Sequence, residues 1–172
     1  MNILIGGIGN IFFGDDAFGV EVVARLQKRG LPASARIRDF GIRGIDLVYA
    51  LQECDVAILV DTVTRGSAPG TLYVIEADEP GAEPSTPLAA AHQIDPFNAV
   101  RLARSLGARP HVLVVGCEPE SFGIEHGQDG RLGLSASAAS AVDRAADMVE
   151  ELCTELMTAS APSAITTSVP AN

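Results

Sequence analysis

The sequence predicts an α/β fold, a three-layer sandwich in which helices cover both faces of a mostly parallel, twisted sheet of five strands. Two observations predict it. Five short apolar runs, rich in β-branched residues, recur along the chain, and segments of helical periodicity fill most of the intervals between them. Such alternation is typical of a parallel sheet whose strands are joined by helices.

The first unit shows the pattern most clearly. Residues 2–6 form a short apolar run of the kind found in a buried strand. Glycines and Asn10 then turn the chain into an amphipathic segment, for which we expect a helix over 16–28. A strand, a turn and a helix are therefore expected in that order.

The remaining elements follow from the same periodicities. Strand 56–61 is apolar up to its last residue, Asp61, and the last helix carries apolar side chains at three- and four-residue steps from Val142 to Leu152. In chain order, the further strands are expected at 35–39, 56–61, 71–76 and 112–117, and the further helices at 44–53, 96–106 and 137–157.

Two segments break the pattern. Residues 77–91 are rich in proline and small residues and exceed the usual α/β connection of about 2 to 6 residues. Residues 158–172 are mostly small, polar or proline with no periodic apolar face, so we expect a disordered tail there. The expected organisation is one folded domain over 1–157 followed by that tail.

Composition excludes several classes of partner. With 172 residues, 47% of them apolar, the chain is long enough to bury a core. Its net charge of −10 repels phosphate backbones, so nucleic acid is not an expected partner. There is no apolar stretch of roughly 20 residues and no cleavable N-terminal apolar segment, so we expect no membrane association and a cytoplasmic location.

The three cysteines do not form a recognisable framework. Cys54, Cys117 and Cys153 lie far apart, are odd in number and have no CxxC spacing, which argues against disulfides and a zinc site and favours buried thiols. No serine or cysteine has a neighbouring base in a known nucleophile signature, so covalent catalysis is not favoured.

Three polar residues occupy positions where reactive groups gather in open α/β sheets, at the carboxyl ends of strands. Asp16 follows the first turn, Asp61 ends the third strand, and His92 follows the long loop. Two carboxylates and an imidazole suit a divalent cation such as nickel, zinc, manganese or iron. Each residue also has an ordinary alternative: Asp16 as a helix start, Asp61 as a turn cap and His92 as a surface histidine. His111 and His126 have weaker claims.

A dinucleotide-binding domain is the structural rival. Gly7-Ile-Gly9 follows a strand, and Asp39 ends the second strand as a ribose-binding acid would. The third glycine of that fingerprint is absent, because Phe12 stands there, and the pair Asp15-Asp16 would repel a pyrophosphate at the first helix. No nucleotide is therefore expected.

The N-terminal run closely resembles a known motif. Gly7-Ile-Gly9-Asn10, four residues, Asp15-Asp16, two residues and Gly19 is similar to the motif of the hydrogenase maturation endopeptidases, which process the large subunits of NiFe-hydrogenases. Further similarities follow in order over 1–157, namely Asp39-Phe-Gly41-Ile-Arg-Gly44, Val60-Asp61, Ala68-Pro69-Gly70-Thr71, Ala91-His92-Gln93 and Val115-Gly116-Cys-Glu-Pro119-Glu120-Ser121.

The resemblance implies an enzyme that removes a C-terminal extension from a hydrogenase large-subunit precursor after nickel insertion. It places Asp16, Asp61 and His92 on the family's metal-binding positions, where they would dock nickel supplied by the substrate. These three residues are also the candidates for catalysis, through the metal or as a general base on water. Asp39, Gly41 and Gly44 are candidates for lining the groove that binds the substrate's C-terminal segment.

One alternative to this activity remains open, and two features of the chain bear on how it grips its substrate. The same fold and metal site would serve a nickel-dependent chaperone that binds the large subunit without cutting it, and we expect the free protein to be a monomer. Phe40 replaces the first glycine of the family's double-glycine turn. The phenylalanines near the expected crevice either grip the substrate or belong to the core; they are Phe12, Phe13, Phe18 and Phe40.

Overall fold

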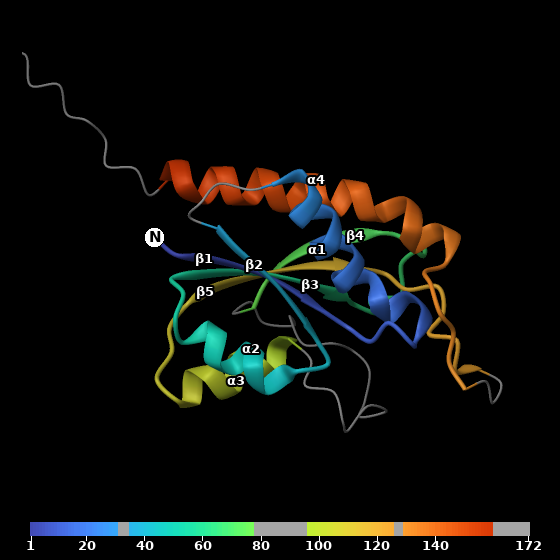
Figure 1. Ribbon diagram of the computed structural model, residues 1–172, viewed down its shortest axis with the longest axis horizontal. Coiled ribbons are helices and arrows are strands. Elements are labelled where there is room, and N and C mark those ends of the chain that lie inside the picture. The colour runs from blue at the N-terminus through green and yellow to red at the C-terminus, as the bar shows by residue number, and fades with distance from the viewer. Residues whose placement is uncertain (31–34, 78–95, 126–128, 160–172) are drawn as a thin grey trace, which may run out of the picture.

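The computed structural model describes residues 1–30, 35–77, 96–125 and 129–159. Five strands form one sheet in the order β2-β1-β3-β5-β4, in which all neighbours are parallel except the antiparallel pair β4 and β5 (Figure 1). The predicted fold class, a mostly parallel five-stranded sheet with helices on both faces, is confirmed.

Each expected strand and helix is present, with shifts of a few residues at the ends. The elements in chain order are β1 Ile3–Ile8, the 3₁₀ helix η1 Gly14–Ala17, α1 Phe18–Arg29, β2 Ala35–Gly41, α2 Gly44–Leu51, β3 Val56–Thr62, β4 Leu72–Glu76, α3 Pro96–Ser105, β5 His111–Cys117 and α4 Ala136–Ala159.

The first unit differs most from expectation. β1 continues to Ile8, because Gly6 and Gly7 pair with both β2 and β3. The α-helical part of the first helix begins only at Phe18, since residues 14–17 form a 3₁₀ turn that contains both Asp15 and Asp16. The carboxylate pair therefore lies just before the first α-helix and not inside it.

Two apolar layers hold the helices on the sheet. α1 and α4 pack on one face and α2 and α3 on the other, as Figure 1 shows above and below the sheet. Burial of residues such as Ile5 and Phe18 in one layer, and of Leu59 and Phe97 in the other, supplies the main favourable free energy of folding. β1 and β3 are buried along almost their whole length because both faces are covered.

Close packing of glycines brings the turn after β1 against the centre of the sheet. A Cβ atom added to Gly19 would lie 2.1 Å from the carbonyl oxygen of Val60, and one added to Gly7 would lie 2.3 Å from the carbonyl oxygen of Gly19. Only glycine permits α1 to approach β1 and β3 this closely. As a result, η1 contacts the carboxyl end of β3.

A β-bulge shapes the sheet edge. Gly7 pairs with Asp39 and Ile8 with Gly41, so Phe40 is the extra residue of β2. Its ring is 1% exposed and packs over Gly6, where an added Cβ atom would lie 2.9 Å from a ring carbon. Phe40, where the related turn has glycine, is therefore a core residue of this chain.

The two segments that break the pattern lie largely outside the described residues. Helix α4 continues to Ala159, two residues beyond the expected end of the domain, and residues 160–172 are not described. The disordered tail therefore stays a prediction. Within the described ranges, no helix is both long enough and apolar enough to cross a membrane.

Candidate functional site

The candidate site lies at the carboxyl ends of β1 and β3. Asp16 belongs to η1, which follows β1, and Asp61 is the next-to-last residue of β3. β1 and β3 are parallel neighbours, with Gly7 opposite Val60, and η1 contacts β3. The structure therefore brings Asp16 and Asp61 to one corner of the sheet, as the sequence predicts.

The turn after β1 orients Asp16. The amide of Asn10 donates to the Asp16 carboxylate at 2.8 Å, and the amide of Asp16 donates to the carbonyl of Phe13 at 3.0 Å. Gly9 has a φ of +134°, and a Cβ atom there would overlap the carbonyl oxygen of Asp16 at 1.7 Å. Gly9 is thus needed to fold the chain back onto this carboxylate, and the backbone amide of Asn10 then holds it.

The same turn is unsuited to a phosphate. The amide of Gly9 donates to the carbonyl of Gly41 at 3.0 Å, that of Asn10 to Asp16, and that of Phe12 to the side-chain oxygen of Asn10 at 3.0 Å. A pyrophosphate site needs such amides to face the ligand. In this turn protein oxygens accept all three, so these amides do not face a ligand.

A hydrogen bond from the last residue of β3 orients the Asp61 carboxylate. Asp61 is 7% exposed, and its carboxylate accepts the amide of Thr62 at 2.7 Å. Its Cα atom lies opposite Gly116 of β5. A nearly buried carboxylate at the end of a central strand is costly unless it is paired or binds a cation.

The neighbouring carboxylate, Asp15, has a different role. It is fully buried and accepts four hydrogen bonds, from the amides of Glu120 and Ser121 at 2.7 and 3.2 Å and from the amide and hydroxyl of Ser135 at 2.6 and 2.9 Å. Asp15 therefore ties η1 to the loop after β5 and to the start of α4. Sequence reasoning noticed the Pro119-Glu120-Ser121 motif without finding this role.

Glu118 is another buried carboxylate, and the sequence did not single it out. It is 4% exposed and accepts hydrogen bonds from the hydroxyl of Tyr73 at 2.6 Å and from the amides of Arg65 and Gly66 at 2.9 and 3.1 Å. Burial raises the pKa of Glu118, but these hydrogen bonds outweigh burial and hold the pKa below its ordinary value. Glu118 thereby fixes the loop that begins just after Asp61.

The third expected ligand, His92, lies outside the described residues, as does His126. Within the described ranges, no three histidine, cysteine or acidic side chains form a group that would hold a metal ion. The structure thus brings together the two carboxylates of the predicted set, and the imidazole stays a prediction.

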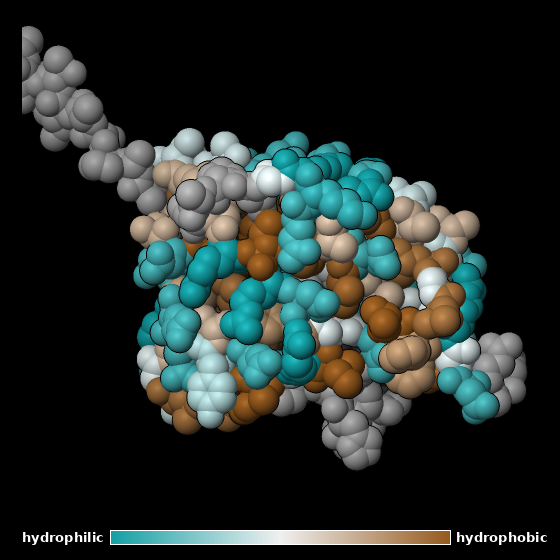
Figure 2. All heavy atoms as spheres, viewed as in Figure 1, coloured by the Kyte–Doolittle hydropathy of each residue, from teal (hydrophilic) through white to brown (hydrophobic). Residues whose placement is uncertain are grey.

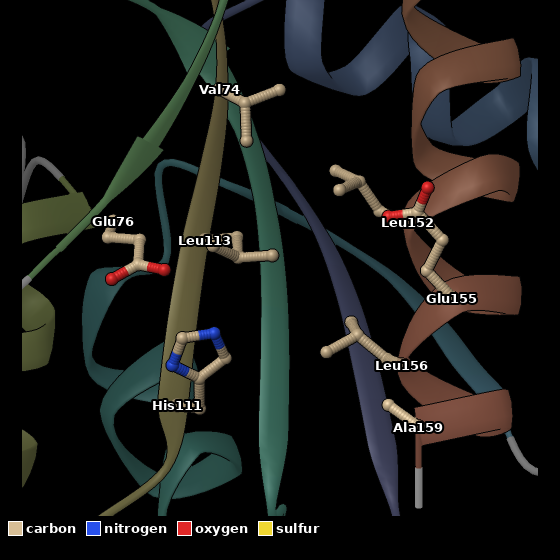
Figure 3. Close-up of a pocket in the computed structure, with 8 residues that line it drawn as sticks. All are labelled: Val74, Glu76, His111, Leu113, Leu152, Glu155, Leu156 and Ala159. Carbon is tan, nitrogen blue, oxygen red and sulfur yellow. The ribbon is translucent and has the colours of Figure 1, made fainter.

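His111 lies at the other end of the sheet. It pairs with Val56, five residues before Asp61 on β3, which corresponds to about 17 Å along the strand. Figure 3 shows it beside a surface hollow of about 430 Å³, between the edge of the sheet and α4. The residues that line this hollow are Val74, Glu76, His111, Leu113, Leu152, Glu155, Leu156 and Ala159. His111 therefore does not belong to the candidate site.

The expected groove residues border the site. Asp39 is exposed near the carboxyl end of β2, and Gly44 begins α2. Gly41 has a φ of +52°, which favours glycine, and its carbonyl accepts the amide of Gly9. The turn after β2 is thus held directly against the turn that carries Asp16.

The phenylalanines and the cysteines differ in how deeply they are buried. Phe18 and Phe40 are core residues, whereas Phe12 is 61% exposed. Cys117 and Cys153 are buried, as predicted, whereas Cys54 is partly exposed, and all three thiols are free. Burial raises the pKa of the Cys117 thiol to about 12 and that of Cys54 to about 11, so neither is a thiolate at neutral pH.

Comparison with known proteins gives a consistent result. Residues 20–152 match the family model described as hydrogenase maturation protease. The chain is 39% identical over 123 residues to the hydrogenase expression/formation protein HoxM of Azotobacter vinelandii, a match that covers 70% of this chain and 59% of the relative. It is 35% identical over 154 residues to a Methanocaldococcus jannaschii protein whose name places it among hydrogenase maturation proteases, with 86% and 94% coverage.

Solved structures have the same fold. The hydrogenase maturating endopeptidase HybD of Escherichia coli superposes with a TM-score of 0.71 and 28% identity, covering 91% of this chain and 94% of that one. A hydrogenase 2 maturation peptidase from a Thaumarchaeota archaeon gives 0.65 and 27%, with 90% and 99% coverage. The matches to HoxM and to HupM of Azotobacter chroococcum span only 59% and 61% of those relatives' lengths.

Proposed function

The chain belongs to the hydrogenase maturation protease family, and on that premise we propose that it is an endopeptidase that removes the C-terminal extension of a NiFe-hydrogenase large-subunit precursor. The observation that carries the proposal is the corner formed by Asp16 and Asp61. The amide of Asn10, in the N-terminal motif, holds the Asp16 carboxylate, and η1 contacts β3, which carries Asp61 near its carboxyl end.

Nickel carried by the precursor is the proposed recognition element. Carboxylate oxygens and an imidazole suit this ion, and Asp16, Asp61 and His92 are the residues that would contact it. Asp61 is only 7% exposed, so a cation that contacts it would interact with a carboxylate largely shielded from water, where charges attract more strongly. A precursor without nickel lacks that interaction, and cleavage is therefore restricted to the loaded form.

Hydrolysis by water, without a covalent intermediate, is the proposed chemistry. The cysteine thiols have raised pKa values, which is unfavourable for a thiolate nucleophile. A carboxylate of the pair Asp16 and Asp61 would instead take a proton from an attacking water as a general base. Asp39, Gly41 and Gly44, which border this corner, would line the path of the substrate's C-terminal segment.

Intact mass of a nickel-loaded large-subunit precursor tests the proposal. The precursor is incubated with wild-type protein, with Asp16→Asn, Asp61→Asn and His92→Ala, and with the exposed control Asp129→Asn. We expect loss of a C-terminal peptide with wild type and Asp129→Asn only. Metal-free precursor should keep its full mass throughout.

A stable complex without any loss of mass would contradict the protease proposal. That outcome would favour the other function compatible with this corner, a nickel-dependent chaperone that binds the large subunit without cutting it. Cleavage of metal-free precursor at the wild-type rate would instead contradict nickel recognition while keeping the protease.

A further inference from the structure

Helix α2 exposes an apolar stripe on its outer side. Ile42, just before the helix, is 59% exposed, and Ile45 and Tyr49 are 51% and 62% exposed. Their spacing of three and four residues places them on one side of the helix, while Leu47, Val48 and Leu51 are buried against the sheet. Three large apolar side chains in a row are more than isolated surface residues and mark a surface for binding.

Positive charge lies beside this stripe. Arg36, Arg38 and Arg43 fall within eight positions of a chain that has only 12 basic residues and a net charge of −10. Arg36 and Arg43 lie 3.5 Å from the carboxylates of Glu53 and Asp46. Arg38 stacks 5.0 Å from the centroid of Phe40, and no carboxylate among the described residues forms an ion pair with it.

The two features form one surface because β2 and α2 run side by side. The contact of Arg36 with Glu53 joins the start of β2 to the residues that follow α2. β2 is an edge strand, and no other strand in the described part of the chain pairs with its outer side. Figure 2 shows hydrophilic side chains over β2 and hydrophobic ones near its carboxyl end. We call Arg38, Ile42, Ile45 and Tyr49 the β2–α2 surface.

This surface leads to the candidate site. Gly41, between Arg38 and Ile42, accepts the amide of Gly9, and the amide of the next residue, Asn10, holds Asp16. The rise from Ile42 to Tyr49 is about 10 Å, which three or four residues of an extended chain would span. A segment that passes Asp16 and continues along α2 would therefore cover the whole stripe.

We propose that the β2–α2 surface binds the C-terminal extension of the precursor, as a segment that combines apolar side chains with carboxylates. The inference rests on the proposed function. An extension that ends a chain always carries an α-carboxylate, with a pKa near about 3.5, which is negative at neutral pH. Arg38 is placed to attract that charge or an acidic side chain of the extension, and the stripe buries its apolar residues.

The test measures kcat and KM on the nickel-loaded precursor for Tyr49→Ser and Arg38→Glu. Leu106→Ser and Lys28→Glu are matched controls, since Leu106 is 58% exposed and both residues lie near the opposite end of the strands. We expect KM to rise about tenfold for Tyr49→Ser and at least about threefold for Arg38→Glu, with kcat within about twofold of wild type. The controls should keep both constants.

A second readout keeps the two proposals distinguishable. The precursor's extension, as a fluorescent peptide, is titrated with each variant at low and high salt, and the effect of Arg38→Glu should weaken as salt screens the charge. Cleavage by wild type with KM unchanged in both variants would overturn the binding surface alone. Binding that both variants weaken, without any cleavage, would keep the surface and overturn the protease. A wild-type dimer that Tyr49→Ser dissociates would assign the stripe to a second copy of this chain and overturn the inference.

Discussion

Replacing Asp15 by asparagine should destabilise the protein strongly, although the two side chains have nearly the same shape. Three donors meet one oxygen of Asp15, namely the amides of Glu120 and Ser121 and the hydroxyl of Ser135, and the amide of Ser135 meets the other. An asparagine can keep its oxygen toward the three donors, but its NH₂ group then faces the amide of Ser135. At least one hydrogen bond is lost, and a buried donor is left without an acceptor.

The magnitude follows from these contacts. A hydrogen bond to a charged group contributes about 1.5 to 3 kcal/mol, and an unsatisfied buried donor adds a cost of similar size. Since Asp15 is fully buried, water does not replace the lost partner. We expect Asp15→Asn to lower the free energy of unfolding by about 2 to 4 kcal/mol, a large part of the roughly 5 to 15 kcal/mol of an ordinary domain.

Urea unfolding of three variants tests this reasoning. Asp16→Asn changes the adjacent carboxylate, which is partly exposed, and should cost less than half as much while abolishing cleavage. Asp129→Asn, on an exposed loop, should stay within about 0.5 kcal/mol of wild type. A loss below about 1 kcal/mol for Asp15→Asn, or an equal loss for Asp16→Asn, would refute the assignment of a structural role to the first carboxylate and a chemical role to the second.

Two further predictions concern the packing and the charge around the site. Gly19→Ala places a Cβ atom 2.1 Å from the Val60 carbonyl oxygen, so α1 must move away from β3. Thermal melts should show that the free energy of unfolding falls by about 1 to 3 kcal/mol. An unchanged Tm would contradict the close approach of α1 to β3. The depressed pKa of Glu118 means that its stabilising contribution is present above the ordinary value of 4.5 and is lost as the pH falls below that value. The difference in unfolding free energy between wild type and Glu118→Gln, measured from about pH 7 down to about pH 3, should therefore shrink with falling pH, and a constant difference would show that Glu118 acts without its charge.

Much of the fold was predictable because its determinants are local. The apolar run of β3 and the three- and four-residue steps from Val142 to Leu152 were read directly as a strand and a helix. The errors lie at element ends, where tertiary contacts compete with local pattern. β1 extends through Gly6 and Gly7 because strands on both sides pair with it. α1 starts late because Glu120 and Ser135, 105 and 120 positions later than Asp15, hold η1 through hydrogen bonds to that residue.

The site was predictable only in part. Parallel strands bring their carboxyl ends to one edge, so Asp16 and Asp61 were expected together once both strands were identified. His92 was also a candidate because it follows the long loop, and the resemblance placed it on a metal-binding position, but a histidine after a long loop has no local signal that fixes its place in space. Glu118 carried no signal either, because its donors Tyr73, Arg65 and Gly66 lie about fifty positions earlier in the chain.

The sequence by itself determined the order of strands and helices, the family to which they belong and the corner of the sheet where two carboxylates meet, because periodicity and motif spacing are properties of neighbouring residues. Only the tertiary structure decided which of the two adjacent aspartates, Asp15 or Asp16, has a structural role. Asp15 and Asp16 cannot be told apart by residue type, and what separates them is a set of donors 105 to 120 positions away, which fold against one carboxylate and leave the other at the site.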